Sequence, residues 1–552
     1  MKKSIIILMT MVMAFMVINT IYAGGKPQGS IPSSMIYQRD PNLNPPGVFP
    51  INKQTVTLKI GVEQNNQIPD RETNWQTQLM ERQGNYKFIW EIYPSGELQQ
   101  KFELMVMAGG SDMPDVFMYR GLNLAALTKY GQAGMVIPLN VYYENSAYYI
   151  NREKQGLSLD PTKYVTSYDG NIYGVYYASD AVNARHSTAR IMMYEPWLEK
   201  LRLSRPATID QFTNVLRAFR DNDPNGNGQK DEIPFISYNT NMTTGVLYAL
   251  MMPFIYTQPE FWMHNNGKID VAFNKPGWRD GLRYIKLLVD EGLLSPLSFT
   301  QDLAQMTGVI NPLPTRVGSF ARISASNLGS NDPRRSEYVP ITPLEGPAGR
   351  QSLYWPYMPR MSYAITKNCR TPESAFMLAD WMCDEEILIM SRYGEKGVDW
   401  YAPQPPENIS IIAGQTIPLK EINMIWGTPH NKHWASSGPG IEGMKYAFID
   451  LAGADPNNPL DYSVSIARNI LTEMQYAAKD PIVGLIYNEQ EQAVINEFHS
   501  TILTYVGESY ARFVMGDLSI DRDWNNYVSE FNRMGLTQVI AAAQSAWDRM
   551  NK

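Results

Sequence analysis

TVTLKIGV (55–62), FIWEIYP (88–94) and PDVFMY (114–119) are the three segments that decide the fold. The first alternates apolar and polar residues and the others are short apolar runs, so all three are predicted to be strands. Helical sequences separate them, namely NWQTQLMERQG (74–84) and KFELMVMAGG (101–110), and glycines end the second. This alternation predicts an α/β layer with a mainly parallel sheet. Ligands of open α/β sheets lie at the carboxyl ends of the strands.

The same alternation continues through the middle of the chain. ATIDQFTNVLRAFRD (207–221), with Thr208 as N-cap, and WRDGLRYIKLLVDEGLL (278–294) are predicted helices. The last third is mainly helical and finishes with TQVIAAAQSAWDRMN (537–551). We therefore expect an α/β protein of two lobes with a helical C-terminal part, and a ligand cleft between the lobes.

Each lobe is expected to use more than one stretch of chain. The predicted ranges are 55–178 plus about 315–370 for lobe 1, and 179–314 plus about 371–552 for lobe 2.

The N-terminus has the pattern of an export signal. In MKKSIIILMTMVMAFMVINTIYA (1–23), two lysines precede an apolar run that ends at Ala23. This predicts a cleavable secretory signal, with an uncleaved membrane anchor as the alternative. No cysteine follows the apolar run, so a lipid anchor is disfavoured. Residues 24–54 are rich in Gly, Pro, Ser and Asn and are expected to form a flexible leader.

The composition excludes several classes of protein. With 48 Lys+Arg against 55 Asp+Glu the net charge is −7, which argues against nucleic acid as a partner. Two cysteines, Cys369 and Cys383, are too few for a disulfide scaffold. An oxidising compartment would allow them to pair, but Cys383 lies in an apolar helical run, which favours unpaired thiols. The 12 Trp, 33 Tyr and 18 Phe make an unusually aromatic chain.

The most specific local motif is DNDPNGNGQKDE (221–232). It matches an EF-hand calcium loop, in which oxygen ligands at alternate positions surround the ion. One register uses Asp221, Asp223, Asn225, Gly226 and Glu232. A more compact register uses Asp223, Asn225, Asn227, the Gln229 carbonyl, Asp231 and Glu232. Because Pro234 prevents a second helix, either register indicates a structural Ca²⁺ and not a sensor; a metal-free turn is the alternative.

Aromatic rings stack on apolar ligand faces, while polar side-chain tips bond hydroxyl groups. Candidates for this role, each with core packing as its alternative, are Trp75, Tyr173, Tyr177, Trp262, Trp278, Trp355, Trp400, Trp426 and Trp434. Arg360 is an isolated charge in an aromatic stretch and would pair with an acidic ligand or with a neighbouring carboxylate. His430 and His433 have a spacing that a metal could use, but no third ligand lies near them in sequence.

Several motifs occur together in order, including AGGSDMPDVF (108–117), YDGNIYGV (168–175), DPNGNGQKDEIP (223–234) and ARFVMGDLSIDRDWNNYV (511–528). From about Thr55 onward the chain resembles the family 1 extracellular solute-binding proteins of bacterial ABC transporters. The likeness is to the oligosaccharide-type branch that includes alginate-binding proteins and LipO-like lipoproteins.

This resemblance implies two α/β lobes joined by a hinge that close over an oligosaccharide and deliver it to an ABC permease. It also implies a structural calcium in the compact register, no catalytic residues, and a monomeric protein in the periplasm. A secreted carbohydrate-active enzyme and a non-transport ligand sensor are the alternatives. Uronates, neutral oligosaccharides and a peptide all remain open as ligands.

Overall fold

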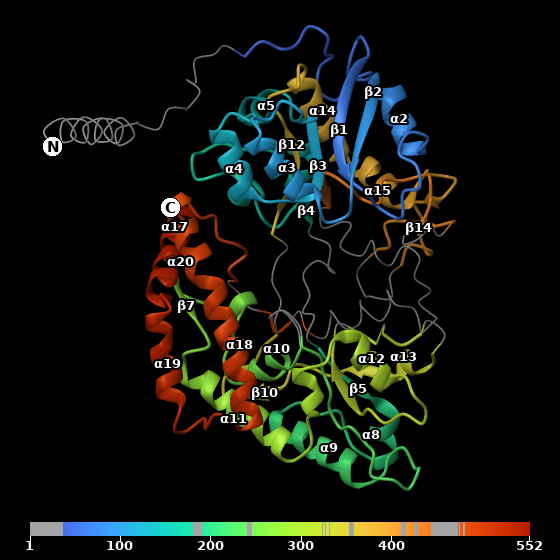
Figure 1. Cartoon of the computed structure of the whole chain (residues 1–552). Coiled ribbons are helices and arrows are strands. Elements are labelled where there is room, and N and C mark those ends of the chain that lie inside the picture. The colour runs from blue at the N-terminus through green and yellow to red at the C-terminus, as the bar shows by residue number, and fades with distance from the viewer. Residues whose placement is uncertain are drawn as a thin grey trace, which may run out of the picture.

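The computed structural model describes residues 37–179, 190–239, 245–322, 324–325, 327–329, 332–352, 358–409, 416–423, 425, 429–442, 473, 475–477 and 481–552. The predicted signal (1–23) and the first part of the leader (24–36) lie outside these residues. The chain forms two lobes, one above the other in Figure 1. No helix in the described part is long and apolar enough to cross a membrane.

Lobe 1 is built on a six-stranded sheet with the order β15-β4-β12-β3-β1-β2. Its strands are β1 (Val56–Glu63), β2 (Tyr86–Tyr93), β3 (Val116–Leu122), β4 (Val175–Ser179), β12 (Arg360–Ile365) and β15 (Gly440–Glu442). β1 lies between β2 and β3 and is parallel to both, as the sequence predicted. β12 runs antiparallel between β3 and β4 and joins the two halves of the sheet.

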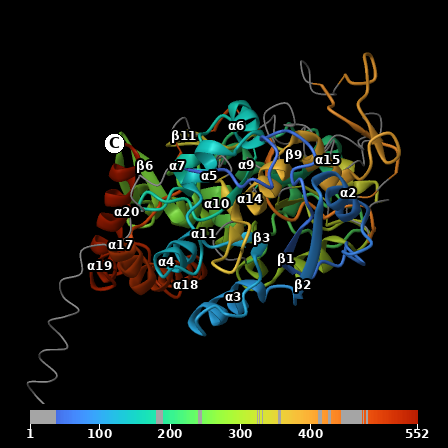
Figure 2. The same cartoon turned by 90° about the horizontal axis from the view of Figure 1, so that it is seen from above.

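Helices cover both faces of this sheet. They are α2 (Trp75–Gly84), α3 (Leu98–Met107), α4 (Leu124–Gln132), α5 (Asn140–Asn145), α6 (Tyr149–Glu153), α7 (Thr162–Val165), α14 (Pro372–Met382) and α15 (Glu385–Tyr393). Phe117 stacks on Phe102 of α3, with ring centroids 4.0 Å apart. Tyr363 donates to the Ala375 carbonyl of α14. Because Phe117 pairs with the residue after Tyr363, α3 and α14 cover opposite faces (Figure 2).

Lobe 2 contains a three-stranded antiparallel sheet with the order β8-β5-β9, formed by β5 (Ile191–Tyr194), β8 (Ser319–Ala321) and β9 (Tyr338–Pro340). Its helices are α8 (Glu195–Leu201), α9 (Ile209–Asp221), α10 (Val246–Met251), α11 (Pro276–Asp290), α12 (Leu303–Ile310) and α13 (Arg334–Glu337). The Thr208 side chain accepts from the Gln211 amide, which confirms it as the N-cap of α9.

Short elements complete the two lobes. They are the two-stranded ribbons β6 (Trp262–Asn265) with β7 (Lys268–Val271), β10 (Glu345–Gly346) with β11 (Gly349–Arg350) and β13 (Trp400–Tyr401) with β14 (Lys420–Glu421), and the turns η1 (Lys154–Gly156), η3 (Pro259–Phe261) and η4 (Pro296–Phe299).

The C-terminal part is helical, as predicted, and flanks lobe 2 on one side (Figure 1). It comprises α17 (Glu489–Val494), a π-helical segment η7 (Ile495–His499), α18 (Ser500–Met515), α19 (Trp524–Arg533) and α20 (Leu536–Met550). Phe513, Tyr527 and Phe531 insert into the same apolar core as Trp278 of α11. These helices are therefore part of lobe 2 and not a separate domain.

The structure corrects two predicted boundaries. The leader does not reach residue 54, because Leu43 and Ile51 are buried in the lobe 1 core. The sequence also assigned residues 315–370 to lobe 1 and everything after them to lobe 2. Instead β8 and β9 pair with β5 of lobe 2, while α14 and α15 pack against the lobe 1 core.

Gly174 shows how closely β4 and β12 approach. A Cβ atom at Gly174 would lie 2.5 Å from the backbone oxygen of Tyr363 in β12. That neighbour is backbone in the centre of a sheet, so it has little freedom to move away. Only glycine fits there without displacing the central strands.

We predict that Gly174→Ala lowers the free energy of unfolding of lobe 1 by about 1–3 kcal/mol, the usual cost of overpacking. Urea unfolding followed by circular dichroism measures the effect. Gly308→Ala is the matched control, because nothing lies within 4 Å of an added Cβ in α12 and alanine favours a helix. Equal stability of Gly174→Ala and wild type would contradict the argument.

Candidate functional site

The carboxyl ends of β1 and β3 open into a pocket of about 470 Å³ on lobe 1. We call it the lobe 1 pocket. Its lining is Glu63, Gln64, Asn65, Asn66, Gln67, Arg71, Ser95, Met118, Tyr119, Arg120, Ala435, Ser436 and Ser437. The pocket lies where an open α/β sheet is expected to bind a ligand. Its polar residues are mostly neutral amides and hydroxyls, which suit hydrogen bonding to sugar hydroxyls.

Arg71 enters this pocket from the loop before α2 and is only 4% exposed. Its Nη2 donates to the backbone oxygen of Glu63 at 3.3 Å, and its guanidinium carbon lies 5.3 Å from the ring centroid of Trp90. Its Nη1 is buried without a hydrogen-bond partner. Burial lowers the pKa of Arg71 to about 10, because no carboxylate offsets the loss of water.

Arg120 follows directly after the apolar part of β3. Its guanidinium carbon lies 3.5 Å from the ring centroid of Tyr177 in β4, and its Nε donates to the Gly438 oxygen at 3.0 Å. Its Nη2 is buried without a hydrogen-bond partner. The cation–π contact and the hydrogen bond together fix the direction of the guanidinium.

A second pocket, of about 480 Å³, shares Arg120 with the first. We call it the inter-lobe pocket, because its lining includes Tyr164 and Arg360 of lobe 1 together with Tyr487 and Gln492 of lobe 2. Close to it, the Lys163 ammonium donates to the Asn551 side chain at 2.7 Å, a direct contact between the lobes. The two pockets meet at Arg120, and the second continues from lobe 1 to residues of lobe 2.

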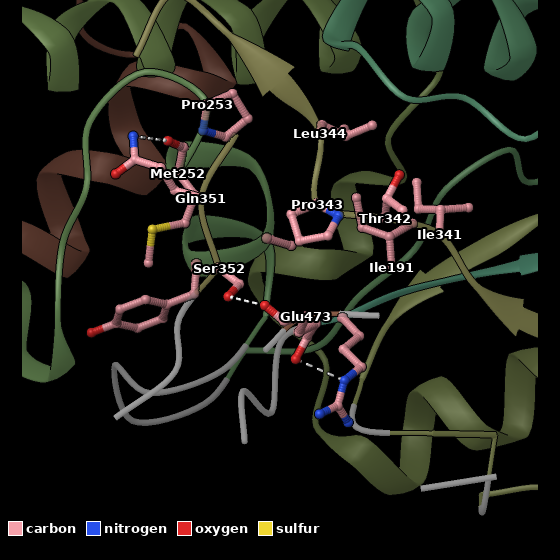
Figure 3. A pocket seen from close by; sticks show the side chains of 13 residues that line it. Ile191, Met252, Pro253, Ile341, Thr342, Pro343, Leu344, Gln351, Ser352 and Glu473 are labelled. Carbon is pink, nitrogen blue, oxygen red and sulfur yellow. Dashed lines mark hydrogen bonds and ion pairs between the residues drawn. The ribbon is translucent and has the colours of Figure 1, made fainter. Parts of the chain in front are cut away.

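A third cavity, on the lobe 2 side, holds only about 30 Å³ (Figure 3). Ser352 donates to the backbone oxygen of Glu473 there, and the Glu473 carboxylate lies 2.9 Å from Nε of Arg190. Burial raises the pKa of Glu473 to about 7, against the opposing effect of Arg190. The cavity is too small for a sugar, and its buried ion pair links Arg190, directly before β5, to Glu473.

The loop 430–437 completes the lobe 1 pocket. Trp434 is fully buried, and its indole donates to Oγ1 of Thr77 in α2. The Asn74 side chain donates to the His433 oxygen. These bonds hold Ala435 and Ser436 at the pocket edge, both with positive φ.

The structure places the predicted ligand residues in three groups. Arg360 lines the inter-lobe pocket, and Tyr177 lines neither pocket but lies against the Arg120 guanidinium. Buried or half-buried in packing contacts are Trp75, Tyr173, Trp262, Trp278, Trp400 and Trp434. Trp355 and Trp426 lie outside the described residues.

Trp278 and Trp434 depart most from the predicted ligand set. Both are 0% exposed, because core side chains cover their ring faces. Tyr173 lies against Gly131 and donates to Asp169, and the indole of Trp400 donates to the Gly394 oxygen. We retain none of these four residues in the site.

Sequence reasoning missed Arg71, Tyr119 and Arg120. Tyr119 and Arg120 stand at the end of a correctly predicted strand, so the rule that ligands bind at strand ends would have found them. The Tyr119 ring lies against Gly121, where an added Cβ would come within 2.4 Å of it. Arg71 follows a loop with no periodicity, so its position relative to a strand end could not be predicted from the sequence.

The predicted calcium loop follows α9 and is folded around Asp223. The carboxylate of Asp223 accepts from the amides of Gly226, Asn227 and Gly228. The Asp231 carboxylate accepts from the side chains of both asparagines, Asn225 and Asn227. These hydrogen bonds hold the side chains of Asn225, Asn227 and Asp231 close to one another.

Glu232 is common to both registers, so the carboxylate of Asp221 distinguishes them. Burial, with repulsion from Asp223 and Asp231, raises the pKa of Glu232, and its Oε1 is buried without a hydrogen-bond partner. Asp221 instead pairs with Arg220 at 2.7 Å. The geometry therefore favours the compact register. In the part of the chain that the structure describes, this loop included, no three His, Cys, Asp or Glu side chains cluster as metal ligands, and both cysteines are free.

Comparison with known proteins supports the same interpretation. A family model described as bacterial extracellular solute-binding protein matches residues 72–387. The fructooligosaccharide ABC transporter substrate-binding protein FusA of Streptococcus pneumoniae serotype 4 (strain ATCC BAA-334 / TIGR4) is 23% identical over 488 residues, which cover 86% of each chain. The family resemblance expected from the sequence is thereby confirmed.

Solved structures confirm the fold. A FusA EF-hand mutant in complex with fructo-nystose superposes with a TM-score of 0.68 at 19% identity, over 90% of this chain and 99% of FusA. An HMO-binding, ABC-transporter-associated solute-binding protein from Bifidobacterium longum infantis ATCC 15697 gives 0.74 at 17% identity, with the same coverage. At these identities the likeness establishes the two-lobed α/β fold alone.

His433 should make the lobe 1 pocket sensitive to acid. Burial lowers its pKa to about 4, and His430 adds repulsion. Because an unfolded histidine titrates near 6.5, the unfolded chain takes up the proton first, and stability present above pH 6.5 is lost as pH falls toward 4. From pH 7 to pH 5 this loss is about 2 kcal/mol.

Urea unfolding of wild type and His433→Asn at both pH values tests this prediction, because asparagine can still accept from the Ala435 amide that now donates to Nδ1. The variant should lose about 2 kcal/mol less than wild type. The same loss in both proteins would show that His433 does not titrate as argued.

Proposed function

Because this chain belongs to the family of bacterial extracellular solute-binding proteins, we propose that it is the substrate-binding component of an ABC importer and captures an oligosaccharide. The single observation that carries the proposal is the inter-lobe pocket, whose lining combines residues of both lobes at the carboxyl end of β3. The names of FusA and of the HMO-binding protein, which describe oligosaccharide binding, support it.

The chemistry of the two pockets suits a saccharide. Tyr119 offers a ring face, and Gln64, Asn66 and Ser437 offer neutral hydrogen-bonding groups. Tyr164 and Tyr487 face the same space from opposite lobes. A ligand that contacts both lobes favours the closed arrangement over any more open one.

In this proposal the mature protein works as an exported monomer in the periplasm. It binds without chemical change and delivers its ligand to the permease. The residues that contact the ligand are Arg71, Tyr119, Arg120 and Arg360, and Tyr177 orients Arg120. Tyr177 and Arg360 are retained from the sequence prediction.

We also propose that the loop holds a structural Ca²⁺ through Asp223, Asn225, Asn227, the Gln229 carbonyl, Asp231 and Glu232. The unpaired, buried Oε1 of Glu232 supports this, because a cation would offset the repulsion among three carboxylates. The EF-hand named for FusA supports it as well. The ion would fasten the end of α9 to the following segment of lobe 2.

Titration of the purified chain with a library of labelled oligosaccharides tests the transport function. We expect saturable binding at a stoichiometry of one, a blue or red shift of tryptophan fluorescence, and recovery of the ligand unaltered by chromatography. Appearance of shortened or modified sugar would instead indicate the secreted enzyme that the sequence left open.

Chelation should lower the melting temperature, and Ca²⁺ should restore it, because a ligand of the native state stabilises by mass action. At a Ca²⁺ concentration 100 times Kd the gain is about 2.7 kcal/mol. Glu232→Gln should remove most of the calcium response. Asp221→Asn, whose carboxylate pairs with Arg220, should keep it. A metal-free protein with an unchanged melting temperature would exclude a structural ion.

A further inference from the structure

Arg71 is buried and Arg120 is half-buried, and neither guanidinium has a carboxylate partner among the described residues. Neither makes an ion pair within the part of the chain that the structure describes, and each has one nitrogen buried without a hydrogen bond, Nη1 of Arg71 and Nη2 of Arg120. Both line the lobe 1 pocket. Burying a charge without a partner is costly in free energy. A bound group of opposite charge would offset that cost.

Buried arginines away from the pocket differ in this respect. Arg334 pairs with Asp332 at 2.6 Å, and Arg190 pairs with Glu473 at 2.9 Å. Buried arginines of lobe 2 are therefore supplied with carboxylate partners. Their absence beside Arg71 and Arg120 is a local property of the pocket.

The one carboxylate of the pocket lining, Glu63, is directed elsewhere. Its Oε1 accepts from the amides of Gly96 and Leu98, at the start of α3. Arg71 contacts only the backbone oxygen of Glu63. With one acid and two arginines, the lining carries a surplus positive charge in a chain whose net charge is −7.

Both guanidiniums are also held in place before any ligand arrives. Arg71 lies near the Trp90 ring and Arg120 lies over the Tyr177 ring. A planar, stacked guanidinium loses little freedom on binding and presents its remaining N–H groups in the geometry that an oxyanion accepts.

From this geometry, and on the basis of the proposed function, we infer that the ligand is an acidic oligosaccharide whose carboxylates are bound by Arg71 and Arg120. Neutral hydroxyls of the same sugar are bound by the amides and hydroxyls of the pocket. Arg360 adds a further basic residue in the adjoining inter-lobe pocket.

Calorimetric titration of the exported chain with tetragalacturonate and tetramannuronate, each beside its carboxyl-reduced counterpart, tests the inference. At least one acid should bind about 30-fold or more tightly than its reduced form, with an affinity that falls as NaCl is raised. Nystose and maltotetraose serve as neutral probes, and a sulfated tetrasaccharide as a probe for other anions.

The variants Arg71→Met and Arg120→Met should each weaken binding of the acid by about 30-fold or more. Arg533→Met is the matched control, because this arginine is exposed on α19, and it should bind like wild type. Without ligand, Arg71→Met should melt at or above the wild-type temperature, because an unpaired buried charge is removed. A sharply lower melting temperature would show that Arg71 supports the fold and would overturn its assignment to the ligand.

The remaining outcomes separate this inference from the proposed function. Binding of neutral probes as tight as binding of acids would overturn the inference and leave the importer function standing. Tight binding of the sulfated sugar alone would overturn the assignment to carboxylates. If no oligosaccharide binds, charged or neutral, both the inference and the proposed function fail.

Discussion

The pairing of β12 with β3 on one side and β4 on the other is the interaction on which the rest of the structure depends. β12 follows β5 to β9 of lobe 2 in the chain, so the lobe 1 sheet is completed only when the chain returns. Such contacts between distant residues close a long loop and are costly in entropy. Their antiparallel register brings the first residue of β12, Arg360, opposite Tyr177, at the same edge where Arg120 lies near the end of β3.

The edge of the lobe 1 sheet where β1 and β3 end determines which charged side chains line the lobe 1 pocket. A sheet buried on both faces leaves few places where a polar side chain reaches solvent, and the strand ends are among them. The Glu63 carboxylate accepts from the backbone amides of Gly96 and Leu98, and Arg71 contacts only the backbone oxygen of Glu63. The fold thus separates the acid from the bases within one pocket and leaves two oriented cations facing an open space.

Features that depend on neighbouring residues in the sequence were predicted correctly. The strands β1 to β3, the cap at Thr208 and the helical C-terminus follow from periodicity and capping, and the ordered motifs indicated the family. The burial of Trp434 could not be read in this way, because it depends on Thr77, 357 residues away. The lobe boundaries failed for the same reason, since β8 and β9 join β5 only through tertiary pairing. Arg71 gave no local signal, although the strand-end rule would have identified Arg120.

The two pockets respond differently to any change in the angle between the lobes. The lining of the lobe 1 pocket comes entirely from lobe 1, so its shape does not depend on that angle. The inter-lobe pocket requires Tyr487 and Gln492 of lobe 2 to face Arg120 and Arg360. A sugar confined to the lobe 1 pocket would bind the closed and the open form equally well. A sugar that extends past Arg120 would bind the closed form more tightly, and only such a ligand can couple recognition to closure.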